Sequence, residues 1–381
     1  MSFICKRSFQ TSARLCQRVF GWGRTEALPL NNCNVETLKK PVCLSERPDY
    51  ALHKHDTVTH VATGWAYSLV CVNAKKIYGF GLIGDAKEPL FDAGSSRNFR
   101  IQLMACGREH SQFVVREDDG GKTHLYSLGN GMYGQLGNGK SKMTDPGTLV
   151  YAHEPTKIEG YQGNITHIAS GLDHTVFATD AHQLYAMGWG ADGQLGLGQG
   201  RTSDANVPAL LPWTAPIKKL AGSTDFTLAL TENGEMWTWG NSEYGQGMTG
   251  AKIDRILEPV RLDVNNVVDM AAGGPFSVVL TADGCVHTCG YGVLGLGADV
   301  LETLTLRKVP GLANVKRVFA ATDYAAALTA DGQVYVWGLN GTSGRLGLGH
   351  TDHAFTPSRL DIDCPIHSLA LGTHHALAIS K

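Results

Sequence analysis

The chain has 381 residues, a formal net charge of −2 and 43% hydrophobic residues. Glycine supplies 46 residues, roughly 12% against a usual figure of about 7%, which indicates many tight turns. No stretch approaches the roughly 18 continuous apolar residues of a membrane span, and the slightly acidic balance excludes an overall electrostatic attraction to phosphate backbones.

The first segment, residues 1–18, is typical of a mitochondrial transit peptide, because it is basic, hydroxyl-rich and free of acidic residues. Its basic residues are Lys6, Arg7, Arg14 and Arg18. A disordered basic tail is the alternative, and a secretory signal would need a longer apolar run. We therefore divide the chain into a transit peptide at 1–18 and one domain at 19–381. The whole chain has a formal charge of −2, and the leader carries four positive charges and no negative ones, so the domain alone has a formal charge of −6.

Two sequence elements recur seven times each along 19–381, so internal repetition decides the fold. The first is an aromatic or apolar strand end that runs into glycines: VFGWG at 19, IYGFG at 77, LYSLGNG at 125, LYAMGWG at 184, MWTWGNS at 236, VHTCGYG at 286 and VYVWGLN at 334. The second is an apolar stretch, a small residue, a turn and a ring side chain: VATGWAYSLV at 61, MACGREHSQF at 104, IASGLDHTVF at 168, LAGSTDFTLA at 220, MAAGGPFSVV at 270, VFAATDYAAA at 318 and LALGTHHALA at 369. Turns of the type Gly-x-Leu-Gly follow several copies of the first element, as in GQLG at 134 and 193.

The ring side chains of the second element set the repeat length, and successive positions lie 43 to 64 residues apart. These positions are Tyr67, His110, His174, Phe226, Phe276, Tyr324 and His375. One repeat of this length, with short β-rich runs and Asn-Gly or Asp-Gly hairpin turns, corresponds to one propeller blade. The sequence therefore predicts an all-β, seven-bladed β-propeller.

The two chain ends each carry half of a repeat, which predicts how the ring closes. The chain starts with a glycine-strand element at 19–23 and ends with a ring-residue element at 366–380. Pairing these two segments would complete the seventh blade and remove exposed strand edges.

Seven copies of both elements, with their glycine turns, resemble the regulator of chromosome condensation (RCC) family of seven-bladed propellers. The resemblance covers residues 19–381, and neither the kelch nor the WD signature recurs here. With the transit-like leader, the chain is similar to the mitochondrial branch of RCC-like, exchange-factor-like proteins. The resemblance implies a matrix or peripheral inner-membrane regulator without a cofactor. Its implied partner is a mitochondrial GTPase, the dynamin-like GTPase of inner-membrane fusion, or alternatively ribosomal RNA and assembly factors of the mitochondrial large ribosomal subunit.

The exchange hypothesis rests on Asp173, because Ser170–His174 matches a Ser-Gly-x-Asp-His element whose aspartate belongs to the exchange surface of the nuclear family member. A simple turn-capping role for Asp173 is the alternative. The nuclear protein has a longer wedge where this chain keeps a regular turn at 130–137, and a histidine pair where this chain has 273–276. Exchange on the nuclear GTPase itself is therefore not expected. From the turn, we expect the following GTPase contacts: Asn130, Met132, Tyr133 and Gln135.

The RNA hypothesis requires a clustered basic face. Its candidate contacts are Lys140, Lys142, Lys218 and Lys219, and the face would also include Lys39, Lys40, Arg307 and Lys308, all expected between strands. The insertions 24–60 and 140–164 are the longest and are expected to be partner-contact loops, with solvated linkers as the alternative.

Several patterns resemble catalytic or cofactor motifs, but the repeat explains them better. Residues 134–141 fit a phosphate loop, yet the following Pro146 and Gly147 cannot continue the required helix. Three histidines share a position with Tyr and Phe in other repeats, which favours a packing role. We therefore expect a binding protein with no catalytic residue, no metal site and no cofactor.

Overall fold

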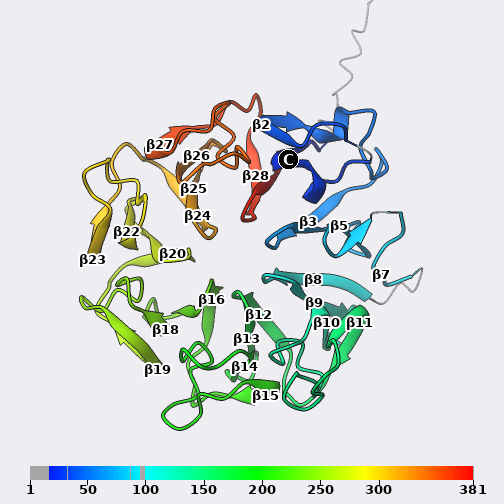
Figure 1. Ribbon diagram of the computed structural model, residues 1–381, viewed down its shortest axis with the longest axis vertical. Coiled ribbons are helices and arrows are strands. Elements are labelled where there is room, and N and C mark those ends of the chain that lie inside the picture. The colour runs from blue at the N-terminus through cyan, green and yellow to red at the C-terminus, as the bar shows by residue number, and fades with distance from the viewer. Residues whose placement is uncertain (1–16, 32, 86, 95–98, 381) are drawn as a thin grey trace, which may run out of the picture.

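The computed structural model describes residues 17–380 apart from 32, 86 and 95–98, and these residues form seven antiparallel sheets around one axis (Figure 1). Each sheet is one blade, and its strands are termed A to D from the axis outward. Six sheets have four strands and one has five. The predicted all-β, seven-bladed propeller is confirmed.

The first four blades follow one another along the chain. Blade 1 contains β3 (Val58–Thr63), β4 (Tyr67–Val72), β5 (Lys76–Gly81) and an outer strand split into β6 (Gly84–Asp85) and β7 (Phe91–Asp92). Blade 2 contains β8 (Phe99–Cys106), β9 (His110–Glu117), β10 (Thr123–Asn130) and β11 (Tyr151–Ile158). Blade 3 contains β12 (Ile165–Ser170), β13 (His174–Thr179), β14 (Leu184–Gly188) and β15 (Ala205–Leu210). Blade 4 contains β16 (Ile217–Gly222), β17 (Phe226–Thr231), β18 (Met236–Ser242) and β19 (Ile253–Leu262).

The last three blades complete the circle. Blade 5 contains β20 (Val267–Ala272), β21 (Phe276–Thr281), β22 (Val286–Tyr291) and β23 (Glu302–Lys308). Blade 6 contains β24 (Val315–Ala320), β25 (Tyr324–Thr329), β26 (Val334–Gly338) and β27 (Ala354–Arg359). Blade 7 joins β28 (Ile366–Leu371) and β29 (His375–Ser380) to β1 (Val19–Arg24) and β2 (Thr37–Cys43). Two 3₁₀ turns, η1 (Thr25–Ala27) and η2 (Leu44–Glu46), flank β2.

Blade 7 closes the ring by pairing the two ends of the chain, as the sequence predicts. Strand β1 runs antiparallel to β29, with Val19 opposite Ile379 and Gly23 opposite His375. Because β1 then fills the third position of the blade, every B and C strand has a neighbour on both sides, and only the D strands have free outer edges.

The predicted leader at 1–18 lies outside the described residues except for its last two. The side-chain amide of Gln17 donates to the carbonyl of Val58 at 2.8 Å and accepts from its backbone N–H at 2.8 Å. The backbone N–H of Arg18 donates to Ser380 Oγ at 2.8 Å, and its guanidinium pairs with Asp363 at 2.7 Å. Gln17 therefore contacts blade 1, and Arg18 contacts blade 7.

The hydrophobic core is divided into layers between neighbouring blades. Seven clusters of buried apolar residues form within the described chain, one at each junction between blades. The cluster between blades 6 and 7, for example, packs Trp22 and Leu369 against Val336. Most B strands are buried along their whole length because both of their faces lie in such layers.

The seven ring side chains of the repeat lie buried at the start of the B strands, and five of them hydrogen-bond to the next blade. The imidazole bonds are His110 Nε2 to Thr175 Oγ1 (3.2 Å), His174 Nε2 to Thr227 Oγ1 (3.0 Å) and His375 Nε2 to Ser68 Oγ (2.8 Å). The phenol bonds are Tyr67 to the carbonyl of His110 (2.6 Å) and Tyr324 to the carbonyl of His375 (3.0 Å). Burial lowers the pKa of each of the three histidines to about 3, so they are neutral. The predicted packing role is confirmed.

The Gly-x-Leu-Gly turns also connect neighbouring blades. Gly347 has φ +72°, and a Cβ there would lie 2.9 Å from the ring of Trp22 in the next blade. Equivalent close contacts with a side chain of the next blade occur in three other turns: Gly137 lies against Met187, Gly196 against Trp239 and Gly295 against Trp337. The final glycine of the turn is thus needed because a buried side chain of the next blade packs against its backbone.

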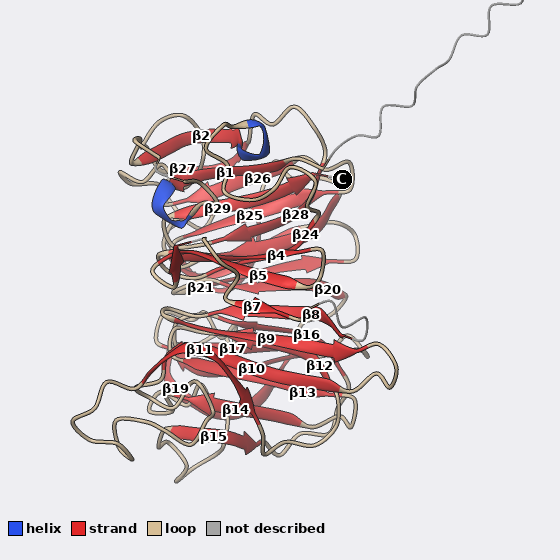
Figure 2. Cartoon of the chain, turned by 90° about the vertical axis from the view of Figure 1, so that its right-hand side faces the viewer, coloured by secondary structure: helices blue, strands red, loops and turns tan. Residues whose placement is uncertain are grey.

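The propeller has two different faces (Figure 2). The AB face carries the A–B turns and the C–D loops, whereas the BC face carries the B–C hairpins and the connections from each D strand to the next A strand. The described C-terminus lies on the BC face, and most of the longer loops lie on the AB face (Figure 2). No helix within the described residues is long and apolar enough to cross a membrane.

The insertions 24–60 and 140–164 are not the loops that we expected along their whole length. Outer strands β2 and β11 occupy part of each. A D strand pairs along one edge only, so it tolerates Pro41 or Pro155 and exposed charged residues, and its sequence resembles a loop. The part of the second insertion before β11, residues 140–150, holds turns and bends and no helix, which agrees with the rejection of a phosphate loop.

Candidate functional site

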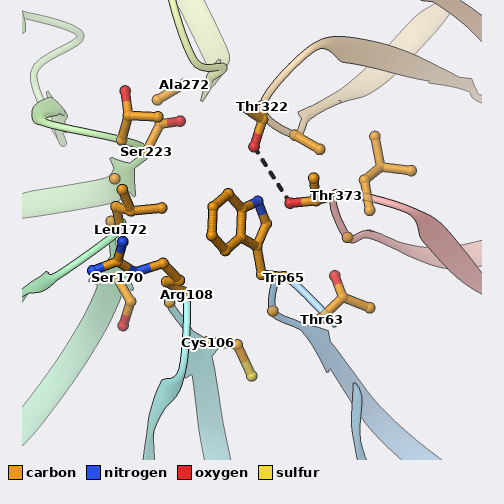
Figure 3. A pocket seen from close by; sticks show the side chains of 18 of the residues that line it. Thr63, Trp65, Cys106, Arg108, Ser170, Leu172, Ser223, Ala272, Thr322 and Thr373 are labelled. Carbon is orange, nitrogen blue, oxygen red and sulfur yellow. Dashed lines mark hydrogen bonds between the residues drawn. The ribbon is translucent and has the colours of Figure 1, made fainter. Parts of the chain in front are cut away.

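A cavity of about 140 Å³ opens at the centre of the AB face, lined by the A–B turns of all seven blades (Figure 3). The indole of Trp65 lies at its centre and is 39% exposed. The guanidinium of Arg108, from the next blade, lies 5.8 Å from the centre of that ring. A large aromatic side chain and a cation therefore meet where the seven blades converge.

Asp173 lies directly behind Arg108. Its carboxylate forms an ion pair with the Arg108 guanidinium and accepts a hydrogen bond from Gln135 Nε2 at 3.4 Å. The residue is only 8% exposed, and burial raises the pKa of its carboxyl while Arg108 opposes that rise. Asp173 thus fixes the position of Arg108, and Arg108 presents the accessible charge.

The predicted turn residues of blade 2 gather beside this pair. Gln135 Oε1 accepts from the Tyr133 backbone N–H at 2.8 Å, and Asn130 Oδ1 accepts from that of Met132 at 2.9 Å. The Tyr133 ring packs edge-on against Trp189 of blade 3, with ring centres 4.8 Å apart. The structure therefore brings Asn130, Met132, Tyr133 and Gln135 together with Asp173 on one face.

Sequence reasoning missed Trp65 and Arg108, the two most prominent side chains of the cavity. Both occupy the place two residues before the ring position, where the other repeats have the smaller residues Leu172, Thr224, Gly274, Thr322 and Thr373. The sequence signal that could have identified them is a large side chain at a repeat position where the other blades have smaller ones.

Exposed apolar side chains also favour the AB face as a contact surface. Among the described residues, eight of the twelve large apolar side chains that are exposed lie in A–B turns, in C–D loops or beside them. They are Val35, Trp65, Leu82, Met143, Leu149, Tyr244, Tyr291 and Leu301. The other four lie in D strands or in β20. Exposed apolar side chains that gather on one face, as these eight do, commonly mark interaction sites.

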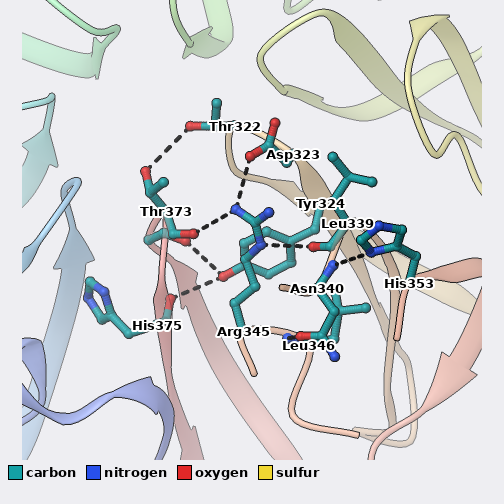
Figure 4. Close-up of polar contacts among 11 residues, drawn as sticks. Thr322, Asp323, Tyr324, Leu339, Asn340, Arg345, Leu346, His353, Thr373 and His375 are labelled. Atoms are coloured by element: carbon teal, nitrogen blue, oxygen red, sulfur yellow. Dashed lines mark hydrogen bonds and ion pairs between the residues drawn. The ribbon is translucent and has the colours of Figure 1, made fainter. Parts of the chain in front are cut away.

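A second polar network on this face has a structural role (Figure 4). The Arg345 guanidinium contacts Asp323 at 2.9 Å, the Thr373 carbonyl at 3.1 Å and the Leu339 carbonyl at 2.8 Å. With a side chain only 9% exposed, Arg345 connects the C–D loop of blade 6 to the A–B turn of blade 7. Its burial distinguishes it from Arg108, whose side chain is 29% exposed.

Asp225, which precedes the ring position of blade 4, has an elevated pKa. Burial, with smaller effects from Asp192 and Asp173, raises the pKa of its carboxyl from 3.8 to about 6. The folded protein therefore binds this proton more tightly than the unfolded chain, so the stabilisation from protonation is present below pH 3.8 and is lost as the pH rises through about 6.

Replacing Asp225 with Asn is expected to stabilise the protein at pH 7.5 by about 1 kcal/mol, after allowance for solvent screening of a half-buried group. The amide keeps the acceptor for Gln194 Nε2, which lies 3.3 Å from Asp225 Oδ1. Urea unfolding at pH 7.5 and pH 4 checks this, and the gain should shrink at the lower pH. Asp263→Asn, at an exposed position in a connection, is the control. A loss of stability at pH 7.5 would contradict the prediction.

The predicted basic face does not form. Of its eight residues, six lie in strands, namely Lys39 and Lys40 in β2, Lys218 and Lys219 in β16, and Arg307 and Lys308 in β23. Lys140 and Lys142 lie in a C–D loop on the AB face, whereas β16 begins at the BC face, so the expectation of one shared loop surface was wrong. Lys142 Nζ lies 4.5 Å from the centre of the Tyr133 ring, and Lys219 forms an ion pair with Asp269.

Comparisons with known proteins agree with the repeat and the fold. The model of the regulator of chromosome condensation (RCC1) repeat matches residues 123–178, 181–230 and 331–379, and a second model of that repeat matches 165–194 and 217–246. The RCC1-like G exchanging factor-like protein of Mus musculus is 28% identical over 372 residues, covering 87% of this chain and 78% of the mouse protein. The mitochondrial RCC1 domain-containing protein RUG3 of Arabidopsis thaliana is 30% identical, covering 76% of this chain and 66% of the plant protein. The crystal structure of human WBSCR16 superposes with a TM-score of 0.81 at 26% identity, covering 96% of this chain and 99% of the human one.

Proposed function

The chain belongs to the regulator of chromosome condensation (RCC1) repeat family, and from that premise we propose that it promotes nucleotide exchange on a GTPase bound to its AB face. Such a regulator needs no covalent chemistry. It accelerates GDP release by binding the nucleotide-free GTPase more tightly than the loaded form, so the coupling free energy between partner and nucleotide drives the exchange.

The observation that carries this proposal is the central pair of Trp65 and Arg108, with Arg108 fixed by Asp173. Binding interfaces concentrate their energy in a few Trp, Tyr and Arg residues near their centre. The exposed aromatic rings of Tyr244 and Tyr291, 5.6 Å apart, extend the same surface toward its edge. The ion pair with Asp173 orders Arg108 before a partner arrives, which lowers the entropic cost of binding.

The proposed partner is a dynamin-like GTPase of mitochondrial inner-membrane fusion. The transit-like composition of residues 1–18 and the plant relative that is named as mitochondrial support that compartment. Cleavage of the leader before Gln17 would keep the bonds of Gln17 and Arg18 to blades 1 and 7. The protein would then act in the matrix or as a peripheral protein at the inner membrane.

The test is release of a fluorescent GDP analogue from a purified mitochondrial dynamin-like GTPase. The native protein is expected to accelerate release, and Trp65→Ala or Arg108→Ala is expected to reduce that acceleration at least tenfold, because each removes a central anchor. Lys157→Ala, on the outer strand of blade 2, is the matched control and should behave as native. Equal activity of the native protein and both anchor variants would refute the proposal, as would the absence of any acceleration.

The alternative is a scaffold for ribosomal RNA and assembly factors of the mitochondrial large ribosomal subunit. Its predicted contacts are divided between the two faces, so they do not form one RNA surface. Purification from mitochondria with and without ribonuclease separates the two functions. A GTPase retained after digestion supports exchange, whereas loss of all partners on digestion supports the scaffold.

A further inference from the structure

All seven A strands contain the same irregularity at their BC-face ends. In six of them the pairing with the B strand shifts register between the first and the third residue, for example between Ile217 and Lys219 and between Val315 and Arg317. In β8, which begins two residues earlier, the same shift lies between Ile101 and Leu103. Such a bulge leaves one residue unpaired and redirects side chains next to it. The second and third residues of these six A strands, with Gln102 and Leu103 at the same place in β8, therefore form a ring around the axis on the BC face, which we call the axial rim.

The axial rim is basic, although the whole chain is slightly acidic. Blades 4 and 6 contribute four cationic side chains, and the carboxylate of Asp269 in blade 5 is the one acidic group of the rim. The formal charge of the rim is thus +3, against −2 for the whole chain. The four cations are Lys218, Lys219, Lys316 and Arg317.

Three of these four cations have no acidic partner within the described part of the chain. Lys218, Lys316 and Arg317 are exposed and form no ion pair there, and the Arg317 guanidinium lies 4.9 Å from the centre of the Phe319 ring. Lys219 is paired with Asp269, which also accepts from the Val318 backbone N–H at 2.9 Å. Asp269 therefore holds one cation inside the rim and leaves the other three available.

The other acidic side chains of the BC face belong to the B–C hairpins and to the connections from D to A strands, such as Glu159, Asp263 and Asp361, and not to the rim itself. Asp180 accepts two hydrogen bonds from Asn164, at 2.8 and 2.9 Å, and Asp331 accepts from Gln333 Nε2 at 2.9 Å. Glu232 lies close enough to His167 of the rim to act on its charge. Asp180 and Asp331 are thus engaged by neighbours outside the rim, and the rim itself keeps its positive formal charge.

We propose that the axial rim on the BC face is a binding site for phosphate groups. Lys ammonium and Arg guanidinium groups are the side chains that recognise phosphate through charge-assisted hydrogen bonds, and the guanidinium presents paired donors. A ring that converges on one axis can surround a single phosphate chain, which is supplied either by a free polyphosphate or nucleotide or by the backbone of a single-stranded RNA. The site lies opposite Trp65 and Arg108, so it is independent of the proposed exchange function.

The experiment measures binding of two probes to the full chain at several salt concentrations: inorganic tripolyphosphate by calorimetry, and a fluorescent single-stranded RNA 12-mer by anisotropy. The double variant Lys316→Ala and Arg317→Ala is expected to weaken binding at least tenfold. For the RNA probe, the slope of log K against log salt should fall in magnitude by about 1.4, since each lost contact to a single strand contributes about 0.7. Asp269→Asn is expected to act in the opposite direction and tighten binding, because it releases Lys219.

Lys39→Ala with Lys40→Ala, which removes the same charge from an outer strand of blade 7, is the matched control and should bind as native. RNA binding without tripolyphosphate binding identifies the source as a nucleic-acid backbone, and binding of both identifies phosphate in general. The proposal is overturned if neither probe binds, or if the control loses as much affinity as the rim variant. Arg108→Ala is expected to bind both probes as the native protein does. This variant therefore separates a failure of the exchange proposal from a failure of the phosphate-site proposal.

Discussion

Lowering the pH from 8 to 5 is expected to destabilise the propeller by several kcal/mol, and replacing His110, His174 and His375 with Phe is expected to abolish most of that loss. Burial lowers the pKa of each imidazole from 6.5 to about 3. Because the unfolded chain then binds protons that the folded one does not, the stabilisation is complete above pH 6.5 and is lost as the pH falls toward 3. At pH 5 each histidine accounts for about 2 kcal/mol at most.

The chain itself supplies the reason for choosing Phe. Phe226 and Phe276 occupy the same position in blades 4 and 5, so the space accepts that ring. At pH 8 each substitution should cost only about 1 kcal/mol, because one hydrogen bond to the next blade is lost. Urea unfolding between pH 4.5 and 8 measures both effects. Replacement of three exposed histidines, His53, His55 and His153, with Gln is the control, and a triple Phe variant as acid-sensitive as the native protein would disprove the explanation.

Trp22→Ala is expected to lower the free energy of unfolding by about 3 to 5 kcal/mol, the usual cost of removing a fully buried Trp. The indole is 0% exposed, packs in the layer between blades 6 and 7, and donates through Nε1 to the Arg345 carbonyl at 2.8 Å. It lies in β1, so the cavity would weaken the blade that joins the chain ends.

Chemical denaturation measures this loss, and hydrogen exchange should show the earliest opening in β1 and β29. Trp65→Ala is the control for the loss of an indole, because that side chain is 39% exposed and should contribute less than about 1 kcal/mol to stability. A loss below 1 kcal/mol for Trp22→Ala would mean that closure of blade 7 depends little on this layer.

The sequence specifies the ring more completely than the site. The repeated ring residues and glycine strands could be predicted because identical packing demands recur at every junction, as in the contact of Gly347 with Trp22. Closure by β1 and β29 followed from the half repeats at the two ends.

The site was less predictable because its residues are single exceptions to the repeat. Asp173 and Gln135 were expected on one surface, and the structure joins them by a hydrogen bond. That Asp173 is covered by Arg108 depends on the packing of two blades, which no local pattern encodes. The outer strands were missed for a related reason, since an edge that pairs on one side only imposes few demands on its sequence.

The pairing of β1 with β29 also determines when the protein can be completed. Val19 emerges from the ribosome 360 residues before its partner Ile379, and until then β1 and β2 have no sheet to join. The entropic cost of closing so long a loop grows only with the logarithm of its length, so the delay burdens assembly more than final stability. A chain released before its last strand would retain an open seventh blade with unpaired edges, so premature termination near the C-terminus is expected to yield aggregation-prone protein that quality-control proteases can recognise.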